Sequence, residues 1–299
     1  MLDGWGDHPV VAQTLIEASD ALGEDIGALI RQGPKEALAL TENTQPVMLV
    51  AGVAAYRVWM AEVGVAPQAV AGHSLGEYSA LVAAGALPLA QAVPLVRLRA
   101  RAMQEAVPVG TGAMAAILGM DAERVVAACA EISAAFEHGS PETVEAANFN
   151  DPLQTVISGS KLAVDKACEL LKSRGAKRAL LLPVSAPFHS SLMRPAAEKL
   201  RQHLEEIELE QPHIALINNI DVAVETDTDR IRDALYRQSF GPVRWVECVG
   251  AIRARKMDYL VECGPGKVLA GMTKRIDAQM TGLALFDTTS LADVRAALA

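Results

Sequence analysis

Ser74 is the residue of this sequence with the clearest capacity for chemistry, because it lies in the pattern Gly72-x-Ser74-x-Gly76. This pattern is typical of a nucleophile elbow, a sharp turn that presents a serine hydroxyl to an acyl group. The apolar run 69–71 before it predicts a buried strand, and residues 77–86 after it predict a helix. We expect a side chain on either glycine to collide with neighbouring backbone, since only glycine lacks a Cβ.

The start of this predicted helix favours negative charge. The backbone N–H of Leu75 lies there, where free amide donors and the helix dipole both attract an anion. We therefore expect this N–H to stabilise the oxyanion of an acyl-transfer intermediate. Gly-x-Ser-x-Gly also occurs in ordinary surface turns, but the strand before it and the helix after it favour the catalytic interpretation.

An attacking serine needs a general base, and His189 is the best-placed histidine. It follows a proline-containing loop that leaves a predicted strand and enters a predicted helix, where a side chain is exposed yet fixed. His73 lies on the elbow itself, so we expect its ring to point elsewhere. The sequence contains no convincing Asp or Glu to orient the imidazole, and a backbone carbonyl can do the same work.

Arg99 is the charged residue that indicates which kind of acyl group the site could bind. A guanidinium offers two parallel N–H donors to a carboxylate, so Arg99 suits an enzyme whose acyl group carries a free carboxylate. A hydrolase of neutral esters has no use for it. The alternative is a solvated helix face, which the neighbouring Arg97 and Arg101 favour on spacing alone.

Length and composition bound the remaining possibilities. A chain of 299 residues with 51% hydrophobic residues predicts a compact soluble protein of one large domain or two modest ones. The net charge of −9 speaks against non-specific nucleic-acid binding. Because the protein as a whole repels an acidic partner, such a partner must dock on a local basic patch. We find no membrane-spanning run and no signal peptide, and we expect a cytoplasmic location without membrane contact.

Cysteine and histidine usage gives no sign of a metal. The four cysteines are scattered without a C-x-x-C pair, and the six histidines form no ligand cluster with them. We predict reduced structural thiols, no metal and no cofactor, and nothing suggests an obligate oligomer, so we expect a monomer.

The order of predicted elements divides the chain in two. Residues 112–186 give the order β-α-β-β-α-β, which is the ferredoxin-like pattern. Strands alternate with helices on either side of this segment, as in α/β proteins. We predict an α/β fold in which a large α/β-hydrolase-like domain with a parallel sheet, residues 1–111 and 187–299, is interrupted by a small ferredoxin-like α+β subdomain.

With these residues in hand, the sequence resembles the malonyl-CoA:acyl carrier protein transacylases of bacterial fatty-acid synthesis. The resemblance covers nearly the whole chain. Its motifs are Gly72-His73-Ser74-Leu75-Gly76-Glu77, Met103-Gln104-Glu105-Ala106-Val107-Pro108, Gly110-Thr111-Gly112-Ala113-Met114, Asn148-Phe149-Asn150, Pro187-Phe188-His189, Asn218-Asn219 and Gly264-Pro265-Gly266-Lys267-Val268-Leu269. It implies that Ser74 takes malonyl from CoA as an ester, with His189 as base and then acid. It also implies that Arg99 grips the malonyl carboxylate, and that malonyl then passes to the phosphopantetheine thiol of acyl carrier protein.

The resemblance also assigns supporting residues. The backbone carbonyl of Gln238 would hold the imidazole, and the Leu75 N–H would be one oxyanion donor. The residues lining the pocket would be Gln45, Met103, Asn148 and Phe188. Malonyl-CoA and the carrier protein would be substrates rather than cofactors. We predict that the acidic carrier protein docks on the basic residues Lys172, Arg174, Lys177 and Arg178.

One departure from the family concerns the beginning of the chain. In this family a first strand and a Gly-Gln-Gly-Ser-Gln loop precede the region that starts here at Met1. The last glutamine of that loop is the family's second oxyanion donor, and losing such a donor costs roughly a hundredfold or more in rate. A sheet without that strand would keep unpaired backbone. We expect that Met1 is an internal methionine taken as the start.

Three other functions remain open from the sequence. The chain could be a stand-alone acyltransferase that serves a polyketide synthase, since only the carrier protein would differ. It could be a serine esterase, although the inserted β-α-β-β-α-β unit and Arg99 argue against this. It could also be a binding module without activity, an alternative that rests only on the departure at Met1.

Overall fold

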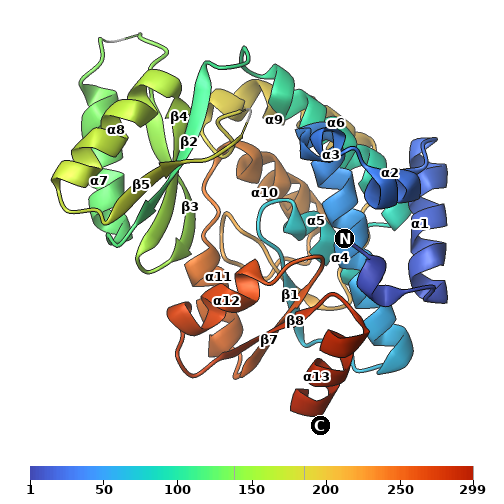
Figure 1. Ribbon diagram of the computed structural model, residues 1–299. Coiled ribbons are helices and arrows are strands. Elements are labelled where there is room, and N and C mark those ends of the chain that lie inside the picture. Colours follow the sequence, from blue (N-terminus) through green and yellow to red (C-terminus); the bar gives the residue numbers. More distant parts are fainter. Residues whose placement is uncertain (138, 185, 299) are drawn as a thin grey trace.

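Two parallel strand pairs lie next to the Gly-x-Ser-x-Gly turn (Figure 1). Strand β1 (Ala69–Ala71) pairs with β6 (Ala215–Ile217), and β7 (Tyr259–Cys263) pairs with β8 (Thr281–Leu285). These pairs confirm the predicted α/β class with parallel strands. The residues that this computed structural model describes are 1–137, 139–184 and 186–298.

Helices cover the strand pairs, and α4 (Thr41–Glu62) lies at the centre of the largest apolar core. Its side chains are buried on most of its circumference, so α4 supports α5, α6 and α1 as a fully buried helix does. The other helices of this part are α1 (Pro9–Leu22), α2 (Ile26–Gln32), α3 (Lys35–Ala39), α5 (Gly76–Ala83), α6 (Leu89–Glu105), α9 (Arg194–Glu206), α10 (Thr228–Phe240), α11 (Trp245–Ala254), α12 (Val268–Ile276) and α13 (Thr288–Leu298), with 3-10 turns η1 (Asp3–Trp5) and η2 (Ser191–Met193).

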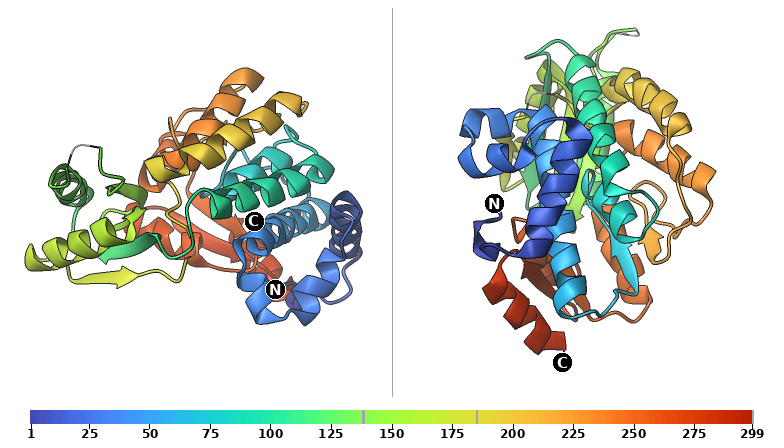
Figure 2. Two further views of the ribbon diagram at one scale, coloured as in Figure 1. Left: turned by 90° about the horizontal axis from the view of Figure 1, so that it is seen from above. Right: turned by 90° about the vertical axis from the view of Figure 1, so that its right-hand side faces the viewer.

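A four-stranded antiparallel sheet forms a separate unit with its own apolar core (Figure 2, left). Its strand order is β3-β4-β2-β5, and α7 and α8 pack on it. Leu171, Val164 and Ala167 on α8 recur at helical spacing and face the sheet core, which explains how this helix docks. The elements are β2 (Gly112–Leu118), α7 (Ala122–Ala134), β3 (Val144–Asp151), β4 (Gln154–Ser160), α8 (Lys161–Ser173) and β5 (Arg178–Leu181).

A backbone bridge joins the small sheet to the rest of the molecule. The Phe149 N–H donates to the Val243 carbonyl at 2.9 Å, and the Val243 N–H donates to the Ala147 carbonyl at 2.8 Å. Strand β3 is irregular between Ala146 and Asn148, where its register with β4 shifts. This bulge turns the end of β3 toward the segment between α10 and α11.

The C-terminal part continues after α12 with strand β8 and helix α13. Strand β8 contains Gly282 and Ala284, which are both disfavoured in strands, so its composition is a weak strand signal. Its pairing with β7 and the contact of Leu285 with the main core hold it in place.

A cavity of about 750 Å³ lies between the two parallel pairs. Both β1 and β7 border it, together with mostly apolar side chains that include Trp59, Leu260 and Met272. In the described part of the chain, β1 and β7 each have one strand partner and are not paired with each other. Each therefore keeps one edge without a strand partner among these residues.

Helix lengths and hydropathy bear on the expectation about membranes. Within residues 1–137, 139–184 and 186–298, no helix is both long and apolar enough to cross a bilayer.

The serine turn needs only one of its two glycines for space. A Cβ on Gly72 would lie 1.9 Å from the carbonyl carbon and oxygen of Gly76, whereas a Cβ on Gly76 would meet nothing within 4 Å. The expectation of a collision at either glycine is therefore wrong for Gly76. This residue begins α5, where an ordinary side chain points into open space.

Replacing Gly72 with Ala should lower the free energy of unfolding by about 1–3 kcal/mol, because the backbone of the turn must shift to make room. Urea unfolding followed by circular dichroism measures the change. The matched control is Gly76→Ala, which should retain or slightly raise stability because Ala is the better helix former. Equal losses in the two variants would contradict the assigned role of Gly72.

Candidate active site

Ser74 occupies the turn between β1 and α5 with a φ of +53°, a left-handed conformation that strains a residue other than glycine. Three hydrogen bonds hold the turn in this shape. Asn219 Oδ1 accepts from the Ser74 N–H at 2.7 Å, and Asn219 Nδ2 donates to the Gly72 carbonyl at 2.7 Å. Gln238 Nε2 donates to the Ser74 carbonyl at 3.0 Å. The peptide groups on both sides of Ser74 are therefore fixed by side chains distant in sequence.

The hydroxyl of Ser74 contacts the imidazole of His189. Ser74 Oγ and His189 Nε2 are 2.6 Å apart. The other ring nitrogen, Nδ1, lies 2.9 Å from the Gln238 carbonyl oxygen and 3.2 Å from that of Gly241. Carbonyl oxygens only accept, so Nδ1 carries the hydrogen and Nε2 is left to accept the serine proton.

His189 is neutral at pH 7 in this environment. Burial and then the positive charge of Arg99 lower its pKa to about 3, since both disfavour an imidazolium. The two carbonyls at Nδ1 act in the opposite direction but do not outweigh burial. A neutral ring with its free lone pair on Ser74 is the form that a general base requires.

Arg99 reaches the same site from α6 and is only 3% exposed. Its Nη1 donates to Gln45 Oε1 at 2.6 Å, and its Nη2 donates to Ser74 Oγ and to Gln238 Oε1, both at 3.2 Å. All three direct partners are neutral groups. The site therefore presents a buried cation beside the hydroxyl, which suits an acyl group with its own carboxylate.

The solvated-face interpretation of the arginines on α6 is wrong for two of them. Arg97 and Arg99 are both buried, and Arg97 pairs with Glu24 at 3.0 Å. Arg101 is exposed and pairs with Glu42, as a surface residue would. Spacing alone did not reveal that α6 is covered on more than one side.

The backbone N–H of Leu75 lies at the N-terminus of α5. The N–H groups of Gly76, Glu77 and Tyr78 bond to the carbonyls three residues earlier. Among the residues that the structure describes, no group accepts from the Leu75 N–H. It is a free donor next to Ser74 at the positive end of a helix, which is the arrangement of an oxyanion donor.

The four residues predicted to line the pocket are placed differently. Gln45 contacts Arg99 directly. Asn148 is buried at the bridge to Val243, and its Nδ2 has no hydrogen-bond partner in the described residues. Met103 and Phe188 belong to one apolar cluster, and Phe188 directly precedes His189 in the sequence. The pocket-lining role of all four residues stays a prediction.

The predicted docking residues Lys172, Arg174, Lys177 and Arg178 are all exposed. They lie at the end of α8 and the start of β5, on the small sheet. Arg174 pairs with Glu131 on α7 at 2.8 Å, so part of its charge is already compensated. No contact places any of them at Ser74, and their docking role stays a prediction.

Sequence reasoning missed Glu77 and the side chains of Asn219 and Gln238. Glu77 Oε2 accepts from the Asn219 N–H at 2.9 Å and from Gln238 Nε2 at 3.0 Å. The signal that could have found it is an acidic residue three positions after Ser74, in the first turn of a helix whose other residues are uncharged. His73 points away from the hydroxyl, as expected, and its Nε2 lies 2.8 Å from Asn150 Oδ1.

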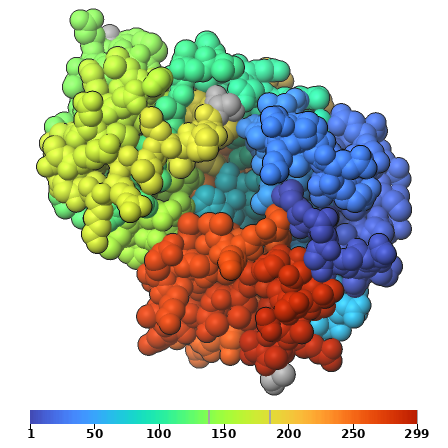
Figure 3. Space-filling model, viewed as in Figure 1, coloured from blue at the N-terminus to red at the C-terminus, as the bar shows by residue number. Residues whose placement is uncertain are grey.

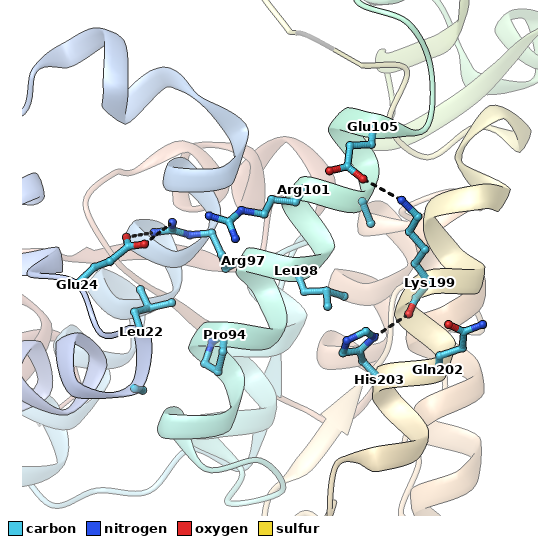
Figure 4. Close-up of a pocket in the computed structure, with 12 residues that line it drawn as sticks. Leu22, Glu24, Pro94, Arg97, Leu98, Arg101, Glu105, Lys199, Gln202 and His203 are labelled. Atoms are coloured by element: carbon cyan, nitrogen blue, oxygen red, sulfur yellow. Dashed lines mark hydrogen bonds and ion pairs between the residues drawn. The ribbon is translucent and has the colours of Figure 1, made fainter.

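The surface is hollowed between the small sheet, the N-terminal helices and the C-terminal segment (Figure 3). The floor of this hollow has the blue-green colour of the segment that contains α5. A separate cavity of about 470 Å³ lies between α1, α6 and α9 (Figure 4). Its cations Arg97 and Lys199 are paired with Glu24 and Glu105, so it offers no free cationic site at these residues.

The described residues contain no group of three or more His, Cys, Asp or Glu side chains that could hold a metal ion. Ser74, His189 and the Leu75 N–H offer the nucleophile, the base and the oxyanion donor that acyl transfer requires.

The charge state of His189 can be measured directly by ¹⁵N NMR of the histidine rings. We expect a neutral ring with hydrogen on Nδ1 down to about pH 5, and protonation only toward about pH 3, because burial and Arg99 oppose the charge. Titration of His189 near the ordinary histidine value of about 6.5 would contradict this environment.

Comparison with known proteins shows which family this sequence matches. The family model described as an acyl transferase domain matches residues 6–280. A malonyl CoA-acyl carrier protein transacylase of Escherichia coli K12 is 49% identical over 292 residues, which are 98% of this chain and 93% of the relative. One of Bacillus subtilis is 42% identical over 283 residues, 95% of this chain and 87% of the relative.

Solved structures agree with these sequence relatives. An acyl-carrier-protein S-malonyltransferase of Burkholderia pseudomallei is 58% identical with a TM-score of 0.94, covering 98% of this chain and 94% of that one. A malonyl transacylase in complex with a type II polyketide synthase acyl carrier protein is 50% identical with a TM-score of 0.92, covering 96% and 91%. By its family model and by these relatives, the chain belongs to the acyl transferase family, among the malonyl CoA-acyl carrier protein transacylases.

Proposed function

We propose that this protein transfers malonyl from malonyl-CoA to the phosphopantetheine thiol of acyl carrier protein and thereby supplies fatty-acid elongation. The observation that carries the proposal is the buried Arg99 guanidinium 3.2 Å from Ser74 Oγ, which in turn lies 2.6 Å from His189. The names of the relatives in the family support the same transfer.

The first half-reaction forms a malonyl ester on Ser74. Ser74 Oγ attacks the thioester carbonyl while His189 Nε2 takes its proton, and the Leu75 N–H donates to the oxyanion. The tetrahedral intermediate then expels the CoA sulfur, which receives the proton from His189. One methylene separates the malonyl carboxylate from the reacting carbonyl. The Arg99 guanidinium beside Ser74 Oγ is therefore within reach of this carboxylate.

The second half-reaction reverses these roles with a new thiol. The phosphopantetheine thiol gives its proton to His189 Nε2 and attacks the ester carbonyl, and Ser74 leaves with that proton. The Gln238 carbonyl stabilises the positive ring in each direction, because it accepts from Nδ1–H. Gln45 and the Gln238 side chain hold the guanidinium of Arg99 in place.

The finer description of the fold is part of this proposal. The strand order β3-β4-β2-β5 with α7 and α8 supports a ferredoxin-like subdomain at residues 112–186. The strand–turn–helix at Ser74 between parallel strands supports an α/β-hydrolase-like domain at 1–111 and 187–299. A cytoplasmic location remains a prediction.

Transfer to a polyketide synthase carrier is the second candidate, because one structural relative forms a complex with the acyl carrier protein of a type II polyketide synthase. A competition assay distinguishes the two. Purified protein is given malonyl-CoA and equal amounts of the fatty-acid and polyketide carrier proteins, and the malonylated carriers are separated. We expect faster malonylation of the fatty-acid carrier; preference for the polyketide carrier would reverse the assignment, and malonylation of neither would contradict both.

Arg99→Ala should lower kcat/KM for malonyl-CoA by about 100-fold or more, because the carboxylate loses a buried charge-assisted partner. Loading of acetyl-CoA, which lacks that carboxylate, should fall much less. Rates of Ser74 acylation by both thioesters measure the difference, with Arg101→Ala as the exposed control on the same helix. Equal losses for malonyl and acetyl would remove Arg99 from its proposed role.

Reversal of charge at Lys172, Lys177 and Arg178 together should raise KM for the acidic carrier protein several-fold and leave KM for malonyl-CoA unchanged. Steady-state kinetics with each substrate varied in turn make the measurement. Reversal of the exposed Arg255 at the end of α11 is the control for a charge change elsewhere on the surface. A KM for the carrier that stays the same would show an ordinary solvated surface.

A further inference from the structure

Glu77 is a buried carboxylate that the transfer mechanism does not use. It lies on the first turn of α5 and is 2% exposed. Both of its hydrogen bonds, from the Asn219 N–H and from Gln238 Nε2, go to Oε2. Oε1 is therefore available to take a proton without loss of either bond.

Two amides connect this carboxylate to the reacting groups. The Asn219 side chain holds the two peptide groups that precede Ser74, and Gln238 holds the one that follows it through the Ser74 carbonyl. An ionised carboxylate only accepts, so Glu77 fixes the Gln238 amide with Nε2 toward itself. That orientation leaves Gln238 Oε1 to accept from Arg99. Glu77 thus determines which end of this amide the guanidinium meets.

Charge links Glu77 to Arg99 as well. The direct partners of Arg99 are neutral, so its buried positive charge depends on a carboxylate one residue further away. The positive charge lowers the pKa of Glu77, but burial outweighs it and raises that pKa to about 7. In the free protein, Glu77 is therefore close to the midpoint between its charged and neutral forms at pH 7.

We propose that Glu77 is the counter-charge of Arg99 in the unloaded enzyme and that it takes up a proton from solvent when an acyl group with a carboxylate is loaded. This inference rests on the proposed function. An added carboxylate at Arg99 brings a second negative charge into the same buried cluster, and one of the two is then neutralised at Glu77. Glu77 is a positioning residue, since it acts on the substrate through Gln238 and Arg99.

The other titratable groups that face Glu77 do not replace it in this role. Asp221 adds negative charge and raises the pKa of Glu77 further. Tyr78 and Cys248 have pKa values raised to about 12 by burial, so both stay neutral near pH 7. Glu77 is the group of this cluster whose protonation changes near neutral pH.

Proton uptake during loading tests the proposal. Transfer from thioester to serine releases one neutral thiol and consumes no proton near pH 7, so any uptake comes from the protein. In weakly buffered solution with an indicator dye at pH 7, malonyl-CoA should cause uptake of up to about half a proton per acylated Ser74. Acetyl-CoA should cause much less, which subtracts effects of CoA binding and release.

Glu77→Gln keeps an oxygen that can accept both hydrogen bonds but cannot titrate, so its malonyl-dependent uptake should vanish. The matched control is Glu62→Gln, an exposed carboxylate, which should behave as wild type. Uptake that persists in Glu77→Gln, or equal uptake for malonyl and acetyl in the wild type, would overturn the proposal. Absence of any Ser74 acylation by malonyl-CoA would instead overturn the proposed function.

A second measurement needs no variant. If loading takes up a proton, the equilibrium constant for malonyl transfer from CoA to wild-type enzyme should rise several-fold as pH falls from about 8 to about 6. The constant for acetyl should change less, and the ionisation of CoA thiol is common to both. Identical pH dependence for the two acyl groups would contradict the proposal even where Glu77→Gln fails to fold.

Discussion

Gln238 holds the candidate site together, because one residue bonds to four of its groups. Its backbone carbonyl accepts from His189, while its side-chain amide bonds to Arg99, Ser74 and Glu77. Buried polar groups are costly unless they are satisfied, and a satisfied network in a low-dielectric site is rigid. The position of the base, the cation and the nucleophile relative to one another therefore depends on this one side chain on α10.

The buried cation makes this rigidity useful. Arg99 meets only neutral partners, so it keeps its capacity to bind a carboxylate from the acyl group. Its charge and the burial of the site also keep His189 neutral. The same desolvation thus serves selection of the acyl group and activation of the serine. A carboxylate of the protein paired directly with Arg99 would remove its capacity to select the acyl group. Hydration of the site would remove the effect that keeps His189 neutral and able to activate the serine.

The sequence allowed Ser74, Arg99 and His189 to be predicted, because a local motif and the chemistry of each residue type point to them. It also allowed most elements to be placed, since their periodicity is local. The support around the site was not predictable in this way. The bonds that join Asn219 to Ser74 and to Glu77 connect residues more than a hundred positions apart, and no local pattern indicates them. Gly76 was misjudged because the motif alone does not indicate that its Cα faces open space at the start of α5.

The central claim is that Ser74 carries the malonyl group between the two thiols. The direct measurement is mass spectrometry of peptides from enzyme quenched in acid after mixing with malonyl-CoA in the absence of carrier protein. The account predicts one malonyl group, on the peptide that contains Ser74, and its loss when carrier protein is added before quenching. Malonyl found on another residue, or a malonylated Ser74 that the carrier does not discharge, would contradict the account.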